Sequence, residues 1–311
     1  MMLTILFSAR PDSWDQYDDP LNDALSDAGI GPFRVVTQAA ADEVDYIVYA
    51  PDSGLTDFSV FPRLKAVLSL WAGVERIVGN PTITVPLARM VDAGLREGMR
   101  EWVTGHVLRH HLGMDAHILG TPGIWTKQVP PLARDRTVAI LGLGELGAAS
   151  AEALVHLGFR VSGWSRRPKD LPGMRCHHGA EGLDTCLREA EIVVLLLPDT
   201  PATQNILNSR TLDLLPKGAV IINPGRGPLI DDDALLAALD SGRVGHATLD
   251  VFRVEPLPTD HPYWAHPKVT VTPHIASETR PATASKVVAE NIRRKEAGEP
   301  MLNLVDRGVG Y

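Results

Sequence analysis

A strand-like segment that ends in a glycine turn constrains this chain more than any other feature. The run Thr137-Val-Ala-Ile-Leu is apolar and β-prone, and it leads into the G-x-G-x-x-G pattern of Gly142, Gly144 and Gly147. A small-residue, helix-like segment follows over 148–157. In such a unit the first glycine permits the tight turn, the second lets the backbone approach a pyrophosphate, and the third lets the helix pack on its strand. Because the free N–H groups at the start of the helix also favour an anion, this segment predicts a dinucleotide-binding site.

Composition limits the size and the partners of the protein. The chain has 311 residues, enough for two domains. Its net charge of −8 and pI of about 5.8 argue against nucleic acid as the main partner, because no basic field covers the whole chain. Two cysteines, Cys176 and Cys186, are too few for a disulfide scaffold and fit a reducing compartment. The apolar segment 1–7 is too short for a signal peptide, and no apolar run is long enough to span a membrane, so we expect a cytoplasmic protein.

Short apolar runs alternate with helix-like segments along most of the chain. In the first part we expect strands at 3–7, 46–48 and 66–68 and a helix over 19–25. A proline-free segment at 98–119 predicts one long helix. After the glycine turn we expect helices at 145–157, 183–190, 209–215, 231–241 and 282–296, and strands at 160–164, 192–197, 219–223, 246–250 and 269–272. This alternation predicts an α/β fold with a doubly wound parallel sheet.

The loop after the second strand of the glycine-turn unit indicates which nicotinamide cofactor is bound. An NAD site usually has an acidic residue there, about 20 residues beyond the glycines. This chain instead has Ser165, Arg166, Arg167 and Lys169. Arginine forks match phosphate oxygens, so the loop is suited to a 2′-phosphate and predicts NADPH in preference to NADH. The alternative is an ordinary basic surface loop.

Residues that could carry chemistry follow three later strands. Arg226 lies in a glycine turn, Asp250 and Glu255 surround the next strand end, and His274 follows the last strand. Each has a simpler reading, as a surface arginine, a capping carboxylate or a packed histidine. Ligands bind at the carboxyl ends of strands in such sheets, and this shared position favours a site. His106 and His110 are four residues apart, but no further ligand is at helical spacing, so we predict no metal.

The order of these motifs resembles the D-2-hydroxyacid dehydrogenase family, and within it the glyoxylate/hydroxypyruvate reductase A branch. The family resemblance rests on the glycine turn and on five stretches that follow it: Leu197-Pro-Asp-Thr-Pro-Ala-Thr203, Asn223-Pro-Gly-Arg-Gly227, Leu249-Asp-Val-Phe252, Glu255-Pro-Leu-Pro258 and Thr272-Pro-His-Ile-Ala276. The branch resemblance rests on Trp164-Ser-Arg166, Asp233 to Gly242, Thr279-Arg-Pro281, and the end of the chain from Val305 to Tyr311.

The resemblance implies a reaction and its residues. It implies that His274 gives a proton to the keto oxygen, that Glu255 orients and charges His274, and that Arg226 binds the substrate. It also implies that the backbone of Ala72, Gly73 and Val74, beside Trp71, holds the substrate carboxylate, and that Asp250 contacts the nicotinamide carboxamide. The other expected cofactor contacts, besides the three glycines and the basic loop, are Glu145, Leu146, Leu197, Pro198, Thr203, Pro224, Gly225 and His274.

The resemblance also implies an organisation. A Rossmann coenzyme domain is expected at 98–280, and a smaller flavodoxin-like substrate domain at 1–97 plus 281–311, in a homodimer. The function implied is the NADPH-dependent reduction of glyoxylate and hydroxypyruvate. A broader dehydrogenase for another 2-keto acid and a non-catalytic NAD(P)-sensing protein are the alternatives.

Two positions depart from the family pattern. Gly225 replaces the usual alanine before the arginine, which we expect to loosen that turn, and Trp71 replaces the branch's usual glycine. Because Trp71 is bulky, we expect it to change the size of substrate accepted.

Overall fold

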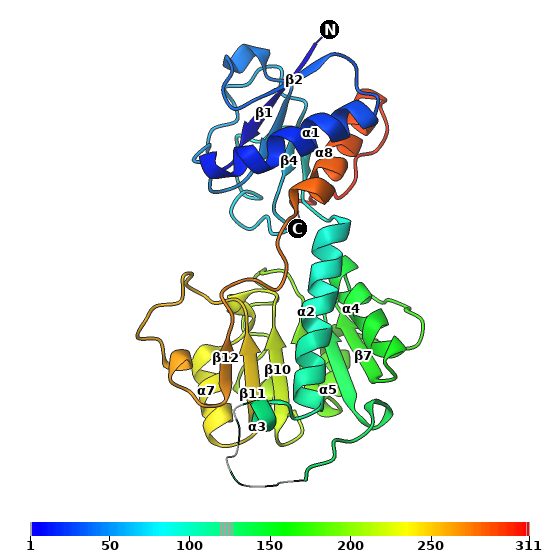
Figure 1. Cartoon of the computed structure of the whole chain (residues 1–311), viewed down its shortest axis with the longest axis vertical. Coiled ribbons are helices and arrows are strands. Elements are labelled where there is room, and N and C mark those ends of the chain that lie inside the picture. The colour runs from blue at the N-terminus through cyan, green and yellow to red at the C-terminus, as the bar shows by residue number, and fades with distance from the viewer. Residues whose placement is uncertain are drawn as a thin grey trace. The chain divides into compact units, whose positions relative to one another are not determined.

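The chain folds into two units, each built on its own sheet. The computed structural model describes residues 2–308 and 310, except 119, 121, 122, 124 and 126. One unit contains Met1–Leu95 and Glu278–Tyr311, and the other contains Arg96–Ser277 (Figure 1). The predicted boundaries, 97/98 and 280/281, lie close to these divisions, whereas Tyr311 of the branch pattern lies outside the described residues. Among the described helices, none is both long enough and apolar enough to cross a membrane.

The first unit has a five-stranded parallel sheet with the order β2-β1-β3-β4-β5. This is the flavodoxin-like order. Two helices, α1 (Trp14–Asp27) and α8 (Pro281–Glu296), lie side by side on the sheet and share its core (Figure 1). The strands are β1 (Leu3–Ser8), β2 (Phe33–Val36), β3 (Tyr46–Tyr49), β4 (Ala66–Ser69) and β5 (Leu87–Ala88).

The second unit has a seven-stranded parallel sheet with the order β12-β11-β10-β9-β6-β7-β8. Its first six strands in chain order follow the dinucleotide-binding order 3-2-1-4-5-6, and β12 extends the edge. The order reverses between β6 and β9, where a ligand is expected. The strands are β6 (Thr137–Leu141), β7 (Arg160–Ser165), β8 (Arg175–His178), β9 (Ile192–Leu195), β10 (Ala219–Asn223), β11 (Val244–Leu249) and β12 (Val269–Val271).

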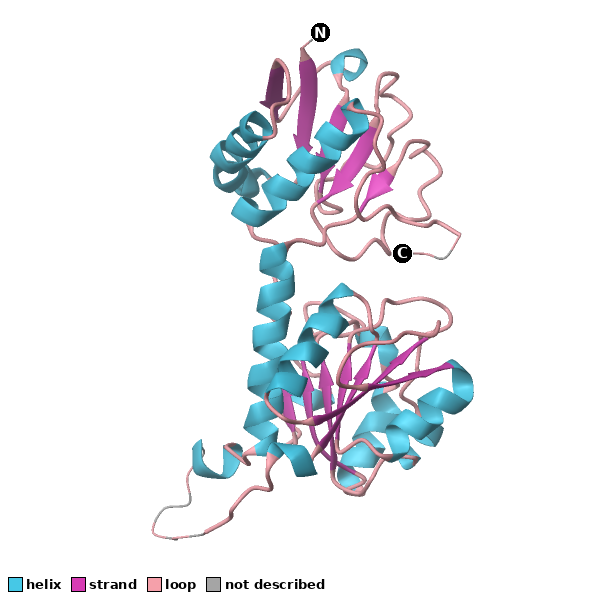
Figure 2. Cartoon of the chain, turned by 90° about the vertical axis from the view of Figure 1, so that its right-hand side faces the viewer, coloured by secondary structure: helices cyan, strands magenta, loops and turns pink. Residues whose placement is uncertain are grey.

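Helices cover both faces of this second sheet (Figure 2). The α5, α6 and α7 helices pack on one face and α2 and α4 on the other. Successive residues of β6 alternate between the two cores, because Leu141 belongs to the first and Ile140 to the second. The helices are α2 (Ala93–His111), α3 (Asp115–Ile118), α4 (Glu145–His156), α5 (Gly179–Arg188), α6 (Ser209–Asp213) and α7 (Asp232–Asp240).

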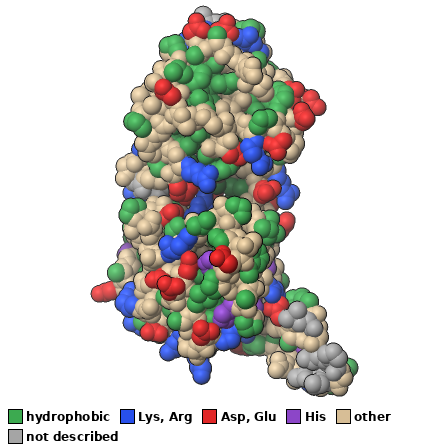
Figure 3. Space-filling model, turned by 90° about the vertical axis from the view of Figure 1, so that its left-hand side faces the viewer, with side chains coloured by type: hydrophobic (Ala, Val, Ile, Leu, Met, Phe, Trp, Pro, Cys, Tyr) green, Lys and Arg blue, Asp and Glu red, His purple; other side chains and the backbone are tan. Residues whose placement is uncertain are grey.

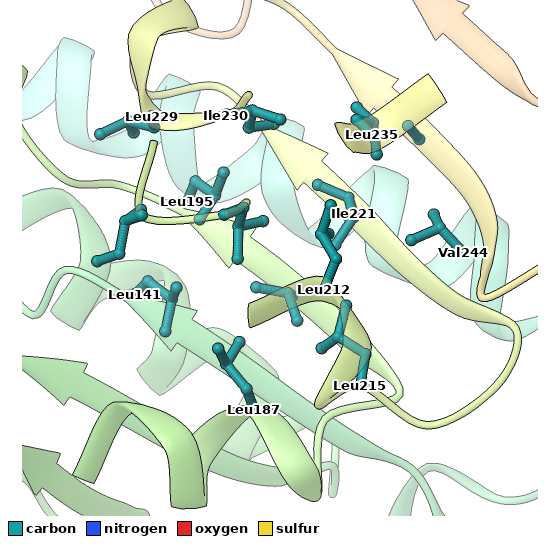
Figure 4. Packing of buried hydrophobic residues seen from close by; sticks show 14 of the residues in the cluster. Leu141, Leu187, Leu195, Leu212, Leu215, Ile221, Leu229, Ile230, Leu235 and Val244 are labelled. Carbon is teal, nitrogen blue, oxygen red and sulfur yellow. The ribbon is translucent and has the colours of Figure 1, made fainter. Parts of the chain in front are cut away.

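The buried side chains of the first of these cores hold the strands that end at the predicted site (Figure 4). Leu141, Leu195 and Ile221 come from the adjacent strands β6, β9 and β10, and all three are fully buried. Leu187 of α5 and Leu235 of α7 cover them. The doubly wound α/β fold predicted from the sequence is therefore confirmed. On the face shown in Figure 3, acidic and basic side chains are interspersed.

Several element boundaries predicted from the sequence are wrong. The first helix begins at Trp14 instead of at residue 19, because Trp14 and Tyr17 pack on Phe7 with ring centroids 5.2 and 5.3 Å apart. The long helix predicted over 98–119 begins at Ala93 and ends at His111. Gly113, with φ of 63°, ends it in the left-handed conformation typical of helix C-termini. Leu119 lies outside the described residues.

Candidate active site

The glycine turn has the geometry that a dinucleotide requires. Gly142 follows β6 with φ of 109°, and a Cβ atom there would lie 2.4 Å from the carbonyl oxygen of Leu196. A Cβ atom at Gly147 would lie 1.8 Å from the carbonyl oxygen of Gly142. Gly144 is the N-cap of α4 without a side-chain cap, and no atom lies within 4 Å of the position of its absent Cβ. The start of α4 is therefore open on the side where a pyrophosphate would approach.

Ser165 fixes the loop that is predicted to bind the 2′-phosphate. Ser165, buried at the end of β7, donates a hydrogen bond from Oγ to the carbonyl oxygen of Arg167 (2.7 Å). Arg166 and Arg167 are exposed in this short turn. At the glycine turn, Glu145 is exposed and Leu146 is half-buried. Two guanidinium groups are thus presented beyond the strand next to β6.

The loop after β9 is closed by Thr203. Its Oγ1 donates to the carbonyl oxygen of Pro198 (2.6 Å) and accepts from the N–H of Thr200 (2.9 Å). Leu197 is buried in the core of the second unit. The loop therefore has a fixed backbone at the point where the strand order reverses.

Asn223 shapes the turn that presents Arg226. Its Oδ1 accepts from the N–H of Gly225 (3.1 Å), and its Nδ2 donates to the carbonyl oxygen of Arg226 (3.0 Å). Pro224 and Gly225 are buried, and Arg226 is half-buried. A Cβ atom at Gly225 would lie 2.7 Å from the carbonyl oxygen of Leu195. The backbone therefore passes so close to β9 that an alanine would need the turn to shift, and the expectation that glycine loosens this turn stays a prediction.

Asp250 holds the loop that presents His274. Its side chain is buried, and its Oδ1 accepts from Thr272 Oγ1 (2.6 Å) and from the N–H of Ile275 (2.9 Å). Its Oδ2 accepts from the N–H of Ala276 (2.9 Å), and its carbonyl oxygen accepts from the N–H of His274 (2.9 Å). His274 has φ of 55°, a conformation that persists in non-glycine residues only when the surroundings enforce it.

Glu255 and His274 form a hydrogen-bonded pair. His274 Nδ1 lies 2.7 Å from Glu255 Oε2, and Glu255 Oε1 accepts from the N–H of Phe252 (2.8 Å). Because an ionised carboxylate only accepts, Nδ1 carries a proton and Nε2 is left for a ligand. The His274 side chain is 51% exposed.

The two members of this pair shift each other's pKa. The hydrogen bond to Glu255 raises the pKa of His274 above its usual value, although burial and Arg226 oppose this. Burial would raise the pKa of Glu255, but the hydrogen bonds from His274 and Phe252 outweigh it and lower that pKa. The pair therefore favours a charged imidazole beside a charged carboxylate.

The loop after β4, in the first unit, has backbone donors without acceptors. Among the hydrogen bonds of the described residues, none is donated by the N–H groups of Ala72, Gly73 or Val74. Ser69 Oγ fixes the start of the loop by accepting from the N–H of Trp71 (3.1 Å). Three successive N–H groups without acceptors are suited to a carboxylate.

The structure thus places every predicted site residue at the end of a strand, in the loop that follows a strand, or in the first turn of α4. Within the second unit, the glycine turn and the basic loop follow β6 and β7, and the loops of Arg226, Glu255 and His274 follow β10, β11 and β12. Asn223 and Thr272 hold these loops, and neither was predicted from the sequence to have a role. An asparagine before Pro-Gly is a turn signal that could have identified the first.

The structure also has a cavity that lies apart from these loops. A cavity of about 580 Å³ in the first unit is lined by Asp45, Arg63, Lys65 and Glu296, among others, and by none of the predicted site residues. In the part of the chain that the structure describes, no three His, Cys, Asp or Glu side chains are grouped to hold a metal ion.

Comparison with known proteins places the chain in a family. The sequence profile described as "D-isomer specific 2-hydroxyacid dehydrogenase, NAD binding domain" matches residues 106–276. Glyoxylate/hydroxypyruvate reductase A of Salmonella newport (strain SL254) is 42% identical over 258 residues, which cover 80% of this chain and 82% of that protein. The chain belongs to the D-isomer specific 2-hydroxyacid dehydrogenase family.

Solved structures of this dehydrogenase family extend the likeness over the whole chain. The D-isomer specific 2-hydroxyacid dehydrogenase from Xanthobacter autotrophicus Py2, in complex with NADPH and MES, has a TM-score of 0.91 and 41% identity, covering 99% of each chain. The NADPH-dependent glyoxylate/hydroxypyruvate reductase from Sinorhizobium meliloti, in complex with NADP and sulfate, has a TM-score of 0.84 and 35% identity, covering 100% of this chain and 99% of that one. The family predicted from the motif order is confirmed.

Proposed function

We propose that this dehydrogenase reduces glyoxylate and hydroxypyruvate, with NADPH, to glycolate and D-glycerate. The observation that supports this most is the pair of His274 and Glu255, joined by a 2.7 Å hydrogen bond, within electrostatic reach of Arg226. An imidazole held protonated beside a guanidinium is suited to an oxygen that becomes negative during the reaction. The named activities of the Salmonella and Sinorhizobium relatives support the choice of substrates.

Each residue of this set has a part in the reaction. A reduced cofactor held at this site would supply a hydride to the keto carbon, and negative charge would then develop on the keto oxygen. His274 Nε2 gives its proton to that oxygen, and Glu255 keeps the imidazole oriented and charged. Arg226 binds the substrate carboxylate and the keto oxygen, which aligns the carbon. In the first unit, the N–H groups of Ala72, Gly73 and Val74 are the proposed donors to a carboxylate.

The cofactor is held by the loops after β6, β7, β9 and β10. The open start of α4 at Gly144 takes the pyrophosphate, and Arg166 and Arg167 take the 2′-phosphate. Asp250 Oδ1 already accepts two hydrogen bonds and Oδ2 one, which leaves one acceptor position on Oδ2 for the nicotinamide carboxamide. The remaining expected contacts are Gly142, Glu145, Leu146, Gly147, Ser165, Leu197, Pro198, Thr203, Pro224 and Gly225.

A panel of 2-keto acids, assayed with NADPH and with NADH by the absorbance of the reduced cofactor, tests the proposal. We expect turnover of glyoxylate and hydroxypyruvate and a lower KM for NADPH. Replacing both Arg166 and Arg167 with alanine should raise the KM for NADPH roughly 10- to 100-fold more than that for NADH, because charge-assisted contacts to the 2′-phosphate are lost.

The matched control for the double variant is Arg210→Ala, an exposed arginine on α6 that pairs with Asp184. It should change neither KM. Equal losses with both cofactors in the Arg166/Arg167 variant would contradict the assignment of NADPH, and no turnover of any 2-keto acid would contradict the reaction itself.

We also propose that the protein is a homodimer. Between α2 and β6, large hydrophobic side chains are exposed, namely Leu112, Met114, Ile118, Trp125, Val129 and Leu132. Such a group of exposed apolar side chains is typical of a surface that a second copy covers. Sedimentation velocity should give twice the chain mass of 33.7 kDa, and a single chain mass would contradict the dimer. The cytoplasmic location stays a prediction, which cell fractionation can test.

A further inference from the structure

Arg76, in the loop after β4, lies against an aromatic ring. The guanidinium of Arg76 lies over the indole ring of Trp71, 5.8 Å from its centroid. This distance is within the range of a cation–π contact. Arg76 is exposed, and among the described residues no carboxylate forms an ion pair with it. The indole ring of Trp71 thus supports the guanidinium of Arg76, whose charge no carboxylate of the described residues neutralises.

Three other cations of the first unit are neutralised by carboxylates. Arg63 donates to Asp45 (3.0 Å) and Lys65 to Glu296 (2.7 Å). Arg34, on the edge strand β2, is paired with Glu43. Arg76 therefore differs from these three residues in having its charge available to a ligand.

The backbone that supports Arg76 and Trp71 is fixed. Ser69 Oγ accepts from the Trp71 N–H (3.1 Å), and the Trp71 carbonyl oxygen accepts from Ser69 Oγ (3.2 Å) and from the N–H of Met90 (3.0 Å). The N–H groups of residues 77 and 78 both donate to the carbonyl oxygen of Val74, at 2.9 and 2.8 Å, which makes residues 74–78 a single tight turn. Because the pair is preorganised, a ligand would lose little affinity to ordering these side chains.

We infer that Arg76 binds a second anionic group of the substrate and that Trp71 holds the guanidinium in place for it. The inference rests on the proposed function, in which the N–H groups of residues 72–74 hold the carboxylate next to the keto carbon. Arg76 follows in the same loop, so it is available to the other end of a substrate bound there. Its planar fork matches the oxygens of a carboxylate or a phosphate.

The inference therefore adds a preferred class to the proposed substrates, namely small 2-keto acids that carry a second anionic group. Substrates with a second anionic group, such as oxaloacetate, 2-oxoglutarate or 3-phosphohydroxypyruvate, should be favoured over glyoxylate, which has no such group. Trp71 contributes by occupying space that a bulky apolar substrate would need and by carrying the guanidinium on its face.

Steady-state kinetics with NADPH on these four compounds tests the inference in the wild type, Arg76→Gln and Arg76→Lys. In Arg76→Gln, kcat/KM for the dianionic substrates should fall roughly 10- to 100-fold more than kcat/KM for glyoxylate, mainly through KM. Arg76→Lys should recover part of the loss, because it keeps the charge but not the planar stack. Arg34→Gln, on the far edge of the same sheet, is the matched control and should leave the ratio unchanged.

The outcomes separate the inference from the proposed function. If Arg76→Gln lowers kcat/KM for all four compounds by the same factor, or if the wild type does not favour dianions over glyoxylate, the inference is overturned while the reaction stands. If neither these four compounds nor hydroxypyruvate is reduced, the proposed function fails. A selective loss for the two dicarboxylic acids would identify the second group as a carboxylate, and a selective loss for the phosphorylated compound would identify it as a phosphate.

Discussion

Two groups of histidines in the second unit have opposite electrostatic surroundings. His274 is hydrogen-bonded to Glu255, which raises its pKa. His110 of α2 lies against His246 of β11, with ring centroids 4.8 Å apart, and its Nε2 is 2.8 Å from Thr248 Oγ1. Burial, His246 and Arg109 lower the pKa of His110 to about 3.

The two groups of histidines differ in whether a carboxylate is free to contact the imidazole ring. Asp115 of α3 raises the pKa of His110, but it is bound by Arg109 at 2.6 and 3.0 Å. His106, another imidazole of α2, also has a lowered pKa, because it is desolvated and near Arg109. Of these histidines, only His274 has a raised pKa, and it is the one whose ring a carboxylate contacts at 2.7 Å. This separates a candidate acid from imidazoles that serve packing.

The largest effect is expected from replacing the histidine that we assign to proton transfer. His274→Gln should lower kcat/KM for glyoxylate reduction about 100- to 10,000-fold, because the proton donor is lost. His110→Gln should change it little, since glutamine can keep the contact with Thr248 and no ligand is assigned to it. Measured kcat/KM values for the two variants compare the two environments directly.

His156→Gln is the control for this comparison. His156 is exposed in the last turn of α4, away from the strand ends that carry the site. Equal activity of His274→Gln and wild type would show that His274 takes no part in the chemistry. A loss in His110→Gln as large as that in His274→Gln would remove the distinction between the two groups.

A smaller effect is expected in the pH dependence of stability, with opposite signs for the two groups. The lowered pKa of His110 means that its contribution to stability is present above the unfolded value of about 6.5 and is lost as pH falls below it. The raised pKa of His274 means that its contribution is present below about 6.5 and is lost as pH rises through the folded value. When the pH is lowered from 7.5 to 5.5, protonation linked to His110 should reduce the free energy of unfolding by about 1 kcal/mol.

Denaturant unfolding at these two pH values, in the wild type and in His110→Gln, measures this cost. The variant should lose less stability than the wild type on acidification. The neighbouring groups whose charges act on His110 are His246, Arg109, Asp115 and His106. An identical pH dependence in the two proteins would show that His110 is not kept neutral in the fold.

The sequence predicted the second sheet better than it predicted the details of the first. Buried parallel strands such as Ile192–Leu195 are continuous apolar runs, so they can be identified without a partner. The edge strands β2, β5 and β8 were missed, because β5 has two residues and β8 (Arg175–His178) is a polar edge strand. Their pairing depends on neighbours that are distant in the sequence.

The site was predicted at the level of residues, but not of the contacts that hold them. The positions of Arg226, Glu255 and His274 follow from strand ends and family motifs. The three side-chain hydrogen bonds of Asp250 connect residues more than twenty positions apart, and the close approach of Gly225 to Leu195 depends on adjacent strands. Such contacts depend on the tertiary structure and have no local sequence pattern.

The proposed reaction depends on His274 as its proton donor and on Glu255 to keep His274 charged. The pH dependence of kcat/KM for glyoxylate reduction in the wild type and in Glu255→Gln tests it most directly. Glutamine has a similar shape but no charge, so the pKa of His274 should fall, and the alkaline decline in activity should move to lower pH in the variant. An alkaline decline at the same pH in both proteins would contradict the claim.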